Sequence, residues 1–263
     1  MNIGIIGTGN IANFLLEAIK GHQLQNDKIT IASIYGRNTA KGKEISEKFR
    51  VDFYNDIDEF LKSGIDTVVE AATVQAVKEL GEKVLHAGKN LVISSVGAMA
   101  DETFYQAMEE LAVSNNVHIY IPSGAIGGID AMKAANALGE LKEVSLTTRK
   151  PPQSLGITDR LQKEKIIYEG SAQAAIQEFP KNINVSIVLS LAGLGSEHTK
   201  VKIIADPNIT KNTHTIEVSG EFGAFQFVVE NASMPNNPKT SYLAALSILS
   251  LLNNMDKHIQ IGG

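Results

Sequence analysis

The stretch Asn2-Ile3-Gly4-Ile5-Ile6-Gly7-Thr8-Gly9-Asn10-Ile11-Ala12 places an apolar run directly before a glycine-rich turn and the start of a helical pattern. It matches the G-x-G-x-x-A form of the dinucleotide-binding fingerprint, in the strand–turn–helix context that this fingerprint requires. Gly7 would allow a tight turn, Gly9 would let a pyrophosphate approach the backbone, and Ala12 would let the helix pack close to the sheet. Unpaired N–H groups at the helix start would face the phosphates. We therefore expect NAD or NADP to bind here, with an ordinary tight turn as the alternative; the expected contacts are Gly7, Gly9, Asn10 and Ile11.

The first half of the chain alternates apolar runs with segments of helical periodicity. Continuous apolar strands joined by helices indicate a parallel sheet that is covered on both faces. This rhythm predicts an α/β fold, with a Rossmann-type doubly wound parallel sheet over residues 1–122. The expected strands are 2–6, 29–35, 51–54, 67–70, 90–95 and 117–121, and the expected helices are 11–19, 40–49, 56–61, 74–86 and 101–113.

The rhythm changes after Pro122, where a glycine-rich loop at 123–128 leads into a helix. Strands then follow one another without regular intervening helices, which predicts an α+β domain with a mixed or antiparallel sheet over residues 123–238. We expect this domain to carry the substrate site, the catalytic residues and the dimer contact. The final segment, 239–263, contains a helix, expected over about 240–252, that we expect to pack back onto the first domain. Within the second domain the expected strands are 142–149, 201–205, 213–219 and 222–229, and the expected helices are 130–138, 172–177 and 183–191.

The composition excludes several classes of function. The chain has 263 residues, a net charge of −5, 43% hydrophobic residues and no cysteine. An acidic protein lacks the basic surface that nucleic acids or membrane surfaces require, so we expect neither as a partner. The lack of cysteine excludes disulfides, thiolate metal sites and a cysteine nucleophile, and we expect no metal in the site. No run approaches the ~20 apolar residues of a membrane span, and no targeting signal is visible, so we expect a cytoplasmic protein.

The end of the second strand bears on the choice of coenzyme. NAD-preferring sites usually carry an acidic residue there, which accepts hydrogen bonds from the ribose. Here Gly36 stands at that point and Arg37 and Asn38 follow. A guanidinium can pair with a 2′-phosphate, so we expect NADP to be accepted and to be the preferred coenzyme, with contacts from Arg37 and Asn38. The alternative is a solvated loop arginine.

Small residues end the fourth and fifth expected strands. Ala71-Ala72-Thr73 follows the fourth strand, and Ser94-Ser95 closes the fifth. The carboxyl ends of parallel strands form the ligand crevice of such a sheet, so we expect these five residues to contact the cofactor. Thr73 could equally serve only as a helix N-cap.

Six histidines are candidates for proton transfer. His22 and His86 lie near helix ends, His118 lies in an expected strand and reads as core, and His258 lies in the C-terminal tail. His198 and His214 remain, both in the second domain. His214 alternates with Thr213 and Thr215 in a strand pattern that would direct it to one face of a sheet.

Four stretches together resemble the L-aspartate dehydrogenase family, in the expected order and over nearly the whole chain. Thr73 stands where a serine is expected, a change that keeps the hydroxyl. The stretches are Ile121-Pro122-Ser123-Gly124-Ala125-Ile126-Gly127-Gly128, Thr147-Thr148-Arg149-Lys150-Pro151-Pro152, Phe179-Pro180-Lys181-Asn182-Ile183-Asn184-Val185 and Asn237-Pro238-Lys239-Thr240-Ser241-Tyr242.

The resemblance implies an NAD(P)-dependent oxidation of L-aspartate to iminoaspartate, which water converts to oxaloacetate and ammonia, in a route that feeds NAD biosynthesis. It also implies that His214 is the active-site histidine and that Ala125 and Asn184 contact the nicotinamide half of the cofactor. Asn184 could otherwise be a helix cap. A histidine whose pKa lies near the working pH can accept and return protons. The resemblance further suggests a homodimer.

The substrate carries two carboxylates, which an acidic protein must hold with local groups. We expect Lys239, Thr240 and Ser241 to hold one of them, at a helix start after Pro238. Lys150, or Arg149 in its place, would hold the other. The alternatives are a surface lysine at 239 and a solvated strand end at 149–150.

Two other functions remain open from the sequence. One is an imine or oxo-acid reductase that resembles dihydrodipicolinate reductase and acts on another substrate. The other is a dinucleotide-sensing protein that keeps the fold without catalysis, because fold alone does not establish activity. Turnover of aspartate would separate them from an aspartate dehydrogenase.

Overall fold

The computed structural model describes residues 1–21, 24, 26, 28–179, 184–234, 237–255 and 257–259, with residues 237–239 described by their backbone alone. The chain forms two compact units. Unit 1 comprises Met1–Pro122 and Ala245–Ile259, and unit 2 comprises the described residues of Ser123–Ala244. None of the helices in the described part of the chain has the length and apolar character needed to cross a bilayer.

Unit 1 is built on a six-stranded sheet in the order β3-β2-β1-β4-β5-β6, in which every neighbouring pair is parallel. The order reverses between β1 and β4, so the loops after these two strands border the crevice where doubly wound sheets bind ligands. The predicted Rossmann-type sheet is confirmed. Its strands are β1 (Asn2–Ile6), β2 (Thr30–Tyr35), β3 (Asp52–Tyr54), β4 (Thr67–Glu70), β5 (Asn90–Ile93) and β6 (Ile119–Tyr120).

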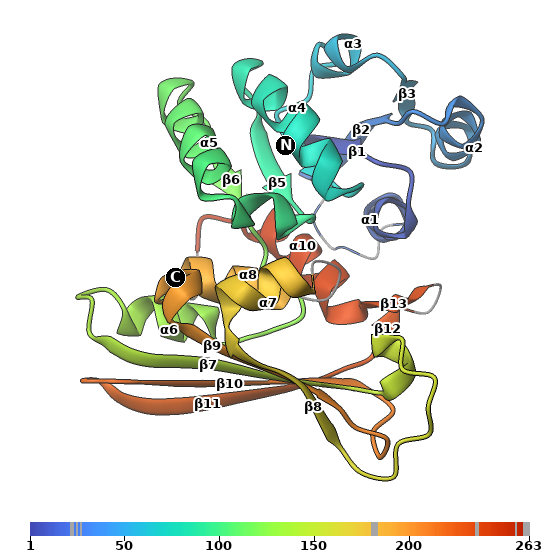
Figure 1. Ribbon diagram of the computed structural model, residues 1–263. Helices are drawn as coiled ribbons and strands as arrows, with labels where there is room; N and C mark the ends of the chain where they lie inside the picture. The colour runs from blue at the N-terminus through green and yellow to red at the C-terminus, as the bar shows by residue number, and fades with distance from the viewer. Residues whose placement is uncertain are drawn as a thin grey trace. The chain divides into compact units, whose positions relative to one another are not determined.

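Helices surround this sheet (Figure 1), and its central strands are buried almost from end to end. A strand that is covered on both faces has no solvent-exposed face, which is why β1 and β4 show no alternation of buried and exposed residues. The helices of this part of the chain are α1 (Asn10–Lys20), α2 (Thr39–Phe49), α3 (Ile57–Leu61), α4 (Val74–His86), the 3-10 helix η1 (Val96–Ala100) and α5 (Glu102–Ser114).

The last helix, α10 (Tyr242–Met255), begins in unit 2 and belongs to unit 1 from Ala245 onward. Its side chains Ile248, Leu249 and Leu252 are buried in the same apolar cluster as β1, β2 and α1. The sequence predicted that this helix starts at 240. It starts two residues later, because Ser241 pairs with Ser233 in a short antiparallel ladder.

Unit 2 is built on a five-stranded mixed sheet in the order β11-β10-β7-β9-β8. Strands β7 and β9 are parallel and the other neighbours are antiparallel, so the predicted mixed sheet is confirmed. The strands are β7 (Leu141–Lys150), β8 (Lys165–Ser171), β9 (Thr199–Ala205), β10 (Asn212–Gly220) and β11 (Gly223–Asn231), and a separate short ladder pairs β12 (Ser233–Met234) with β13 (Asn237–Ser241).

Helices α6, α7 and α8 lie over one face of this sheet (Figure 1). Along β10 the side chains therefore alternate: His214, Ile216 and Val218 are buried, whereas Glu217 on the other face is exposed. Such alternation is typical of a sheet with one covered face. The helices of this unit are α6 (Ile129–Ala135), the 3-10 helix η2 (Pro152–Leu155), α7 (Ala172–Glu178), α8 (Asn184–Ala192) and α9 (Gly195–His198).

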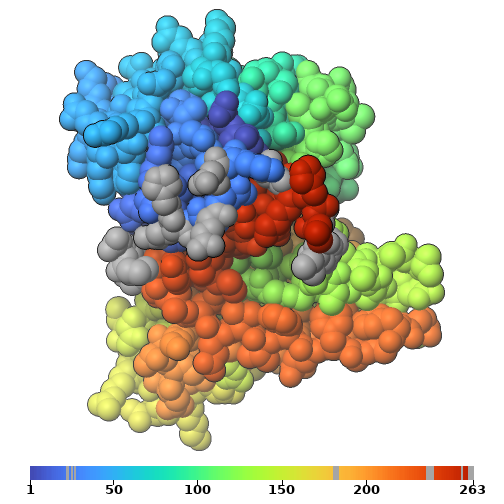
Figure 2. Space-filling model, turned by 180° about the vertical axis from the view of Figure 1, so that it is seen from behind, coloured from blue at the N-terminus to red at the C-terminus, as the bar shows by residue number. Residues whose placement is uncertain are grey.

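Strand β11 forms one edge of the mixed sheet, and Figure 2 shows it with β10 as an orange layer at the surface. Its side chains are exposed on both faces, with Phe227 at 42% and Val228 at 53%. Phe227 lies against Gly127 and Gly128, where a Cβ atom at position 127 would come within 2.4 Å of the ring. The glycine-rich loop after unit 1 therefore fits closely onto this edge strand.

Candidate functional site

The turn after β1 requires glycine at its first position. Gly7 has a φ of 125°, which L side chains rarely adopt, and a Cβ atom there would lie 2.5 Å from the carbonyl oxygen of Ala71. Its N–H donates to the carbonyl of Tyr35 at 2.9 Å. The turn is thus pressed between the ends of β2 and β4, and no larger residue can replace Gly7 without moving the backbone.

The start of helix α1 is open to a ligand. Gly9 is the N-cap and its helix has no side-chain cap, so the N–H groups of the first turn, at Asn10 and Ile11, are not capped from within. A Cβ atom on Gly9 would meet only the carbonyl oxygen of Ala71, at 3.9 Å. Ala12 is fully buried against the sheet, as predicted from its size. This arrangement fits a pyrophosphate, which needs close backbone approach and free N–H donors.

Three loops that follow β1, β2 and β4 enclose a pocket of about 220 Å³. It brings together five residues predicted from the sequence as cofactor contacts, from parts of the chain up to 66 residues apart. Arg37 is exposed at this pocket, so it is available to a phosphate. The residues that line it are Ile6, Gly7, Thr8, Tyr35, Gly36, Arg37, Asn38, Ala72, Thr73, Ala76, Glu79 and Leu80.

Two of these residues also cap helices. The Asn38 side chain accepts from the N–H of Lys41 at 3.0 Å at the start of α2, and the Thr73 hydroxyl accepts from the N–H of Ala76 at 3.1 Å at the start of α4. The capping role that the sequence left open for Thr73 is therefore present. Each cap still leaves donor groups on the side chain, so capping and ligand contact are compatible.

Glu70, at the end of β4, is a buried acid that the sequence analysis did not assign. Only 1% of it is exposed. Its carboxylate accepts from the N–H of Ala72 at 2.7 Å, the N–H of Ser95 at 2.9 Å and the hydroxyl of Ser95 at 2.9 Å. Burial raises the pKa of Glu70, and these hydrogen bonds oppose that effect. Glu70 thereby ties the loops after β4 and β5 together at the sheet edge where a ligand would lie.

His214 is buried on the helix-covered face of the mixed sheet, with 5% exposed. It lies directly opposite Thr148 of β7, and its Nδ1 atom is 2.9 Å from the Thr148 hydroxyl. Burial and, to a smaller extent, the positive charge of Lys150 together lower the pKa of His214 from the usual 6.5 to about 4. The imidazole is therefore neutral at physiological pH, and its pKa lies below the near-neutral value that the sequence analysis expected of a proton acceptor.

The other histidines do not form comparable sites. His118 was expected in the core of a strand; that expectation is wrong, because β6 begins at Ile119 and the His118 side chain is exposed. His86, His198 and His258 are also exposed, and His22 lies outside the described residues. Within the described part of the chain, no group of three or more histidine and acidic residues could hold a metal ion.

Asn231, at the end of β11, is a second buried polar residue that sequence reasoning missed. Its side-chain NH₂ donates to the carbonyl of Ala125 at 3.0 Å, and its side-chain oxygen accepts from the hydroxyl of Ser241. Asn231 therefore connects the loop of Ala125 with the segment of Ser241, and both lie in stretches on which the family resemblance rests. The Ser241 hydroxyl proton is engaged in this contact.

The residues expected to hold substrate carboxylates differ in their surroundings. Lys150 is half-buried at the end of β7, and burial lowers its pKa. Arg149 is paired with Glu164 and, at 3.3 Å, with Asp206, so its charge is already compensated and it is a poor alternative to Lys150.

Thr240 lies in β13 instead of at a helix start, because the ladder with β12 extends through Ser241. The Lys239 side chain lies outside the described part of the structure.

Asn184 is the first residue of helix α8 and is exposed.

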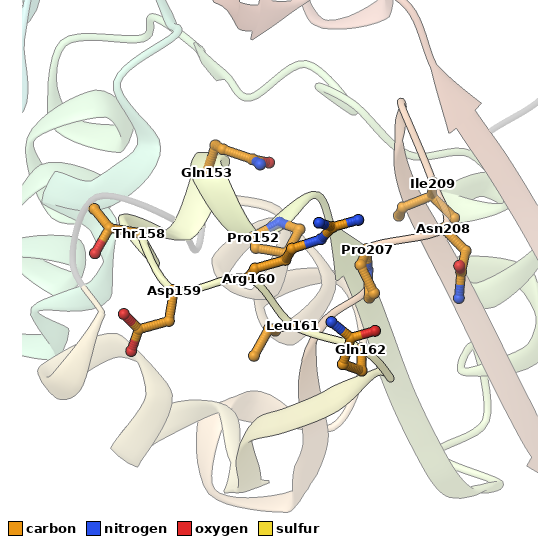
Figure 3. Close-up of a pocket in the computed structure, with 10 residues that line it drawn as sticks. All are labelled: Pro152, Gln153, Thr158, Asp159, Arg160, Leu161, Gln162, Pro207, Asn208 and Ile209. Atoms are coloured by element: carbon orange, nitrogen blue, oxygen red, sulfur yellow. The ribbon is translucent and has the colours of Figure 1, made fainter.

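A separate pocket of about 460 Å³ lies between the segment after β7 and the loop after β9, and Figure 3 shows the Arg160 guanidinium turned toward Pro207. Asp159 points away from it in the same view. None of the predicted site residues lines this pocket. Its lining residues are Pro152, Gln153, Thr158, Asp159, Arg160, Leu161, Gln162, Pro207, Asn208 and Ile209.

Two protein families match the chain, one for each part. The family described as "Homoserine dehydrogenase, NAD binding domain" matches residues 7–122, and the family described as "Aspartate dehydrogenase, C-terminal" matches residues 130–255. The first covers the glycine turn and the sheet of unit 1. The second covers the mixed sheet that carries His214.

Curated relatives match over the full length. An L-aspartate dehydrogenase of Methanococcus maripaludis is 40% identical over 270 residues, and one of Methanosarcina mazei is 41% identical over 272 residues. In both cases the match covers 100% of this chain and 99% of the relative.

Among solved structures, the aspartate dehydrogenase of Thermotoga maritima is similar, with a TM-score of 0.79 and 33% identity over 100% of this chain and 99% of that one. The scyllo-inositol dehydrogenase of Lactobacillus casei with bound NAD(H) and scyllo-inositol has a TM-score of 0.59 at 14% identity, covering 99% of this chain and 91% of that one. The latter likeness concerns the fold alone.

Proposed function

The chain belongs to the aspartate dehydrogenase family of nicotinamide-dinucleotide-dependent oxidoreductases, and we propose that it oxidises L-aspartate to iminoaspartate. In this reaction the substrate loses a hydride from its α-carbon and a proton from its amino group. Water then adds to the imine and ammonia leaves, which gives oxaloacetate. When bound, the oxidised nicotinamide supplies the hydride acceptor.

The buried His214 imidazole is the observation that carries this proposal. The amine must be neutral before the hydride can leave, so the site needs a group that accepts the ammonium proton. His214 is held neutral by burial and by the charge of Lys150, which keeps a lone pair available. We assign His214 as this base, and the same imidazole can activate the water that hydrolyses the imine.

The residues that would hold the coenzyme follow from the pocket and the glycine turn. Gly7, Gly9, Asn10 and Ile11 suit the pyrophosphate, because they combine an unobstructed backbone with helix N–H donors. The small residues after β4 and β5 would border the rest of the coenzyme: Ala71, Ala72, Thr73, Ser94 and Ser95. By the family resemblance, Ala125 and Asn184 would contact the nicotinamide half.

We propose that NADP is accepted and preferred over NAD. Arg37 is exposed at the pocket after β2, and the residues that line it from the end of β2 include no carboxylate; the acidic residue of the pocket, Glu79, comes from α4. Asn38 would add a side-chain donor there. The guanidinium can pair with the phosphate in a bidentate manner.

The substrate carboxylates would be held by Lys150 on one side and by Lys239 with Thr240 and Ser241 on the other. Lys150 is supported by its half-buried place at the end of β7, on the same strand face as Thr148. The hydroxyl proton of Ser241 is given to Asn231, so this proton is engaged in the structure. Lys239→Ala should raise the KM for aspartate more than the KM for the coenzyme.

Three further proposals follow from the family resemblance. The product iminoaspartate would feed NAD biosynthesis, the protein would act in the cytoplasm, and the chain would assemble as a homodimer. Light scattering coupled to chromatography measures the last of these directly, and a monomer mass would remove it.

Steady-state turnover of L-aspartate with NAD and with NADP, followed by absorbance of the reduced coenzyme, tests the proposed function. We expect turnover with both coenzymes and a lower KM for NADP, together with the reverse reaction from oxaloacetate and ammonia. Tight coenzyme binding without turnover would indicate a sensing protein. Turnover only with other imines or oxo acids would indicate a reductase of different specificity.

A further inference from the structure

His214 and Thr148 form a buried polar pair between adjacent strands. They are 66 residues apart in the chain but directly opposite each other in the β7–β10 ladder. Thr148 is 4% exposed and His214 is 5% exposed. On the other side of His214, β11 contributes the apolar residue Val229 at the paired position. The hydroxyl of β7 is therefore the polar group that the neighbouring strands offer to the imidazole.

The contact uses Nδ1, and this matters because the two ring nitrogens of a neutral imidazole differ. One carries a proton and the other carries a lone pair. If the Thr148 hydroxyl donated to Nδ1, the proton of the ring would sit on Nε2 and neither nitrogen could accept another. If the hydroxyl accepts from Nδ1–H, the lone pair is on Nε2.

We propose that Thr148 is the positioning residue of the active-site histidine: its hydroxyl accepts from Nδ1–H and so fixes the tautomer whose lone pair lies on Nε2. This inference rests on the proposed function, because a base must present a lone pair to the substrate. Nε2 is then the atom that takes the amino proton. Thr148 itself does not contact the substrate.

The location of Thr148 makes it suited to this role. Threonine is branched at Cβ, which restricts its χ1 angle, and it stands on a strand whose register is set by pairing on both sides. The hydroxyl is thus held in one place relative to the ring. Lys150 follows two residues later on the same face, so the charge that disfavours the imidazolium comes from the same strand.

The tautomer can be measured without any activity. Long-range proton–nitrogen spectra of the protein labelled with ¹⁵N in histidine distinguish a protonated from an unprotonated ring nitrogen, and the signal of His214 is identified by its loss in His214→Gln. We expect Nδ1 to be protonated and Nε2 unprotonated in the wild type and in Thr148→Ser. In Thr148→Val the proton should shift to Nε2, the usual preference of an unconstrained imidazole. A wild-type ring with its proton on Nε2 would overturn the proposal.

Kinetic measurements then test whether loss of the Thr148 hydroxyl slows the reaction. Thr148→Val should lower kcat about 10- to 100-fold, which is less than the 10²–10⁴-fold total that a positioned base supplies, and should leave the Kd of the coenzyme unchanged. Thr148→Ser should restore most of the rate. The matched control is Thr147→Val on the opposite face of the same strand, where kcat should stay near the wild-type value.

Normal turnover in Thr148→Val would contradict the assignment, as would an equal loss in Thr147→Val. If the wild type turns over no aspartate, the proposed function fails, and the spectra still decide the tautomer. If Thr148→Val does not fold, the wild-type tautomer and the Thr148→Ser rate remain decisive.

Discussion

Unit 1 and unit 2 each bury a titratable side chain at a candidate site, but they stabilise it in different ways. Glu70 is surrounded by donors from the loop that follows its own strand and from the end of the next strand, two of them backbone N–H groups. His214 contacts the Thr148 hydroxyl of the neighbouring strand, and the charge of Lys150 acts on it. The first arrangement fixes backbone around a ligand crevice. The second leaves a side chain free to exchange a proton.

Burial favours the neutral form in both cases, and this has opposite consequences for an acid and a base. It raises the pKa of Glu70 and lowers that of His214. The proposed cofactor site of unit 1 would therefore depend on packing and backbone geometry, whereas the role proposed for His214 in unit 2 would depend on proton transfer. Variants in the two units should differ accordingly.

The largest effect is expected from His214→Ala. Removing the base should lower kcat by about 10²–10⁴-fold, while the Kd of the coenzyme stays near the wild-type value. Steady-state turnover and fluorescence titration with reduced coenzyme measure the two quantities. His198→Ala, an exposed histidine of the same unit, is the control. If the kcat of His214→Ala lay within twofold of the wild-type value, the proposed contrast between a binding role for unit 1 and a catalytic role for unit 2 would be refuted.

The second prediction concerns pH and stability. The unfolded state protonates His214 near pH 6.5 and the folded state near pH 4, so the unfolded state binds more protons between these values. The stability contributed by His214 is thus present above pH 6.5 and is lost as the pH falls to 4. At about 1.4 kcal/mol for each pKa unit, the loss amounts to about 3 kcal/mol. Urea unfolding of the wild type and of His214→Gln across this range should reveal it.

Glu70 should respond in the opposite direction. Its folded pKa is raised above 4.5, so the folded state binds more protons and the contribution of Glu70 declines as the pH rises above 4.5. The unfolding free energy of the wild type minus that of Glu70→Gln should therefore be larger at pH 4.5 than at pH 7. Parallel pH profiles for Glu70→Gln and His214→Gln would show that burial acts alike on both groups, contrary to this expectation.

A fourth prediction compares two glycines with positive φ. Gly7→Ala forces a methyl group against the carbonyl of Ala71 and should cost about 1–3 kcal/mol of stability together with coenzyme affinity. Gly64→Ala also introduces a side chain at positive φ, 76°, but nothing lies within 4 Å of its Cβ position. Thermal unfolding and coenzyme titration should separate them: only Gly7→Ala should weaken coenzyme binding. An equal loss of affinity in Gly64→Ala would refute the steric explanation.

The smallest effect is expected from Arg37→Ala. Loss of the charge-assisted pairing with the 2′-phosphate should raise the KM for NADP at least about 10-fold and leave the KM for NAD within about twofold. Lys43→Ala removes one positive charge from the neighbouring helix α2 and serves as the control for general electrostatics. A KM for NADP that does not change would show that Arg37 is only a solvated loop residue.

Unit 1 could be predicted from local signals. Strands β1 and β4 and helix α4 have the predicted bounds, because apolar runs ended by glycine or by the capping residue Thr73 mark these elements along the chain itself. The hydrogen bonds of Glu70 could not be predicted in this way, because two of them come from Ser95, which follows the next strand. The signal that could have identified this residue in the sequence is its position, because Glu70 is an acidic residue at the end of a largely apolar strand.

Unit 2 depended more on contacts between distant residues. Strand β8 was missed because it is an edge strand with exposed residues and no clear alternation. The partner of His214 could not be identified, because Thr148 is equivalent to Thr147 until the register of β7 and β10 is known. The ion pairs of Arg149 could not be predicted either, because its partners Glu164 and Asp206 lie 15 and 57 residues away in the chain.

The path of α10 has a consequence for the order in which the protein matures. Ile248, Leu249 and Leu252 complete the apolar core around β1 and α1, yet they follow residues 123–244 of unit 2 in the chain and are synthesised after them. The nascent dinucleotide-binding part therefore leaves the ribosome with an unfilled core, and it can close only after the whole of unit 2 has been translated. A fragment that ends at Pro122 would keep that exposed apolar surface permanently, which makes aggregation its expected fate.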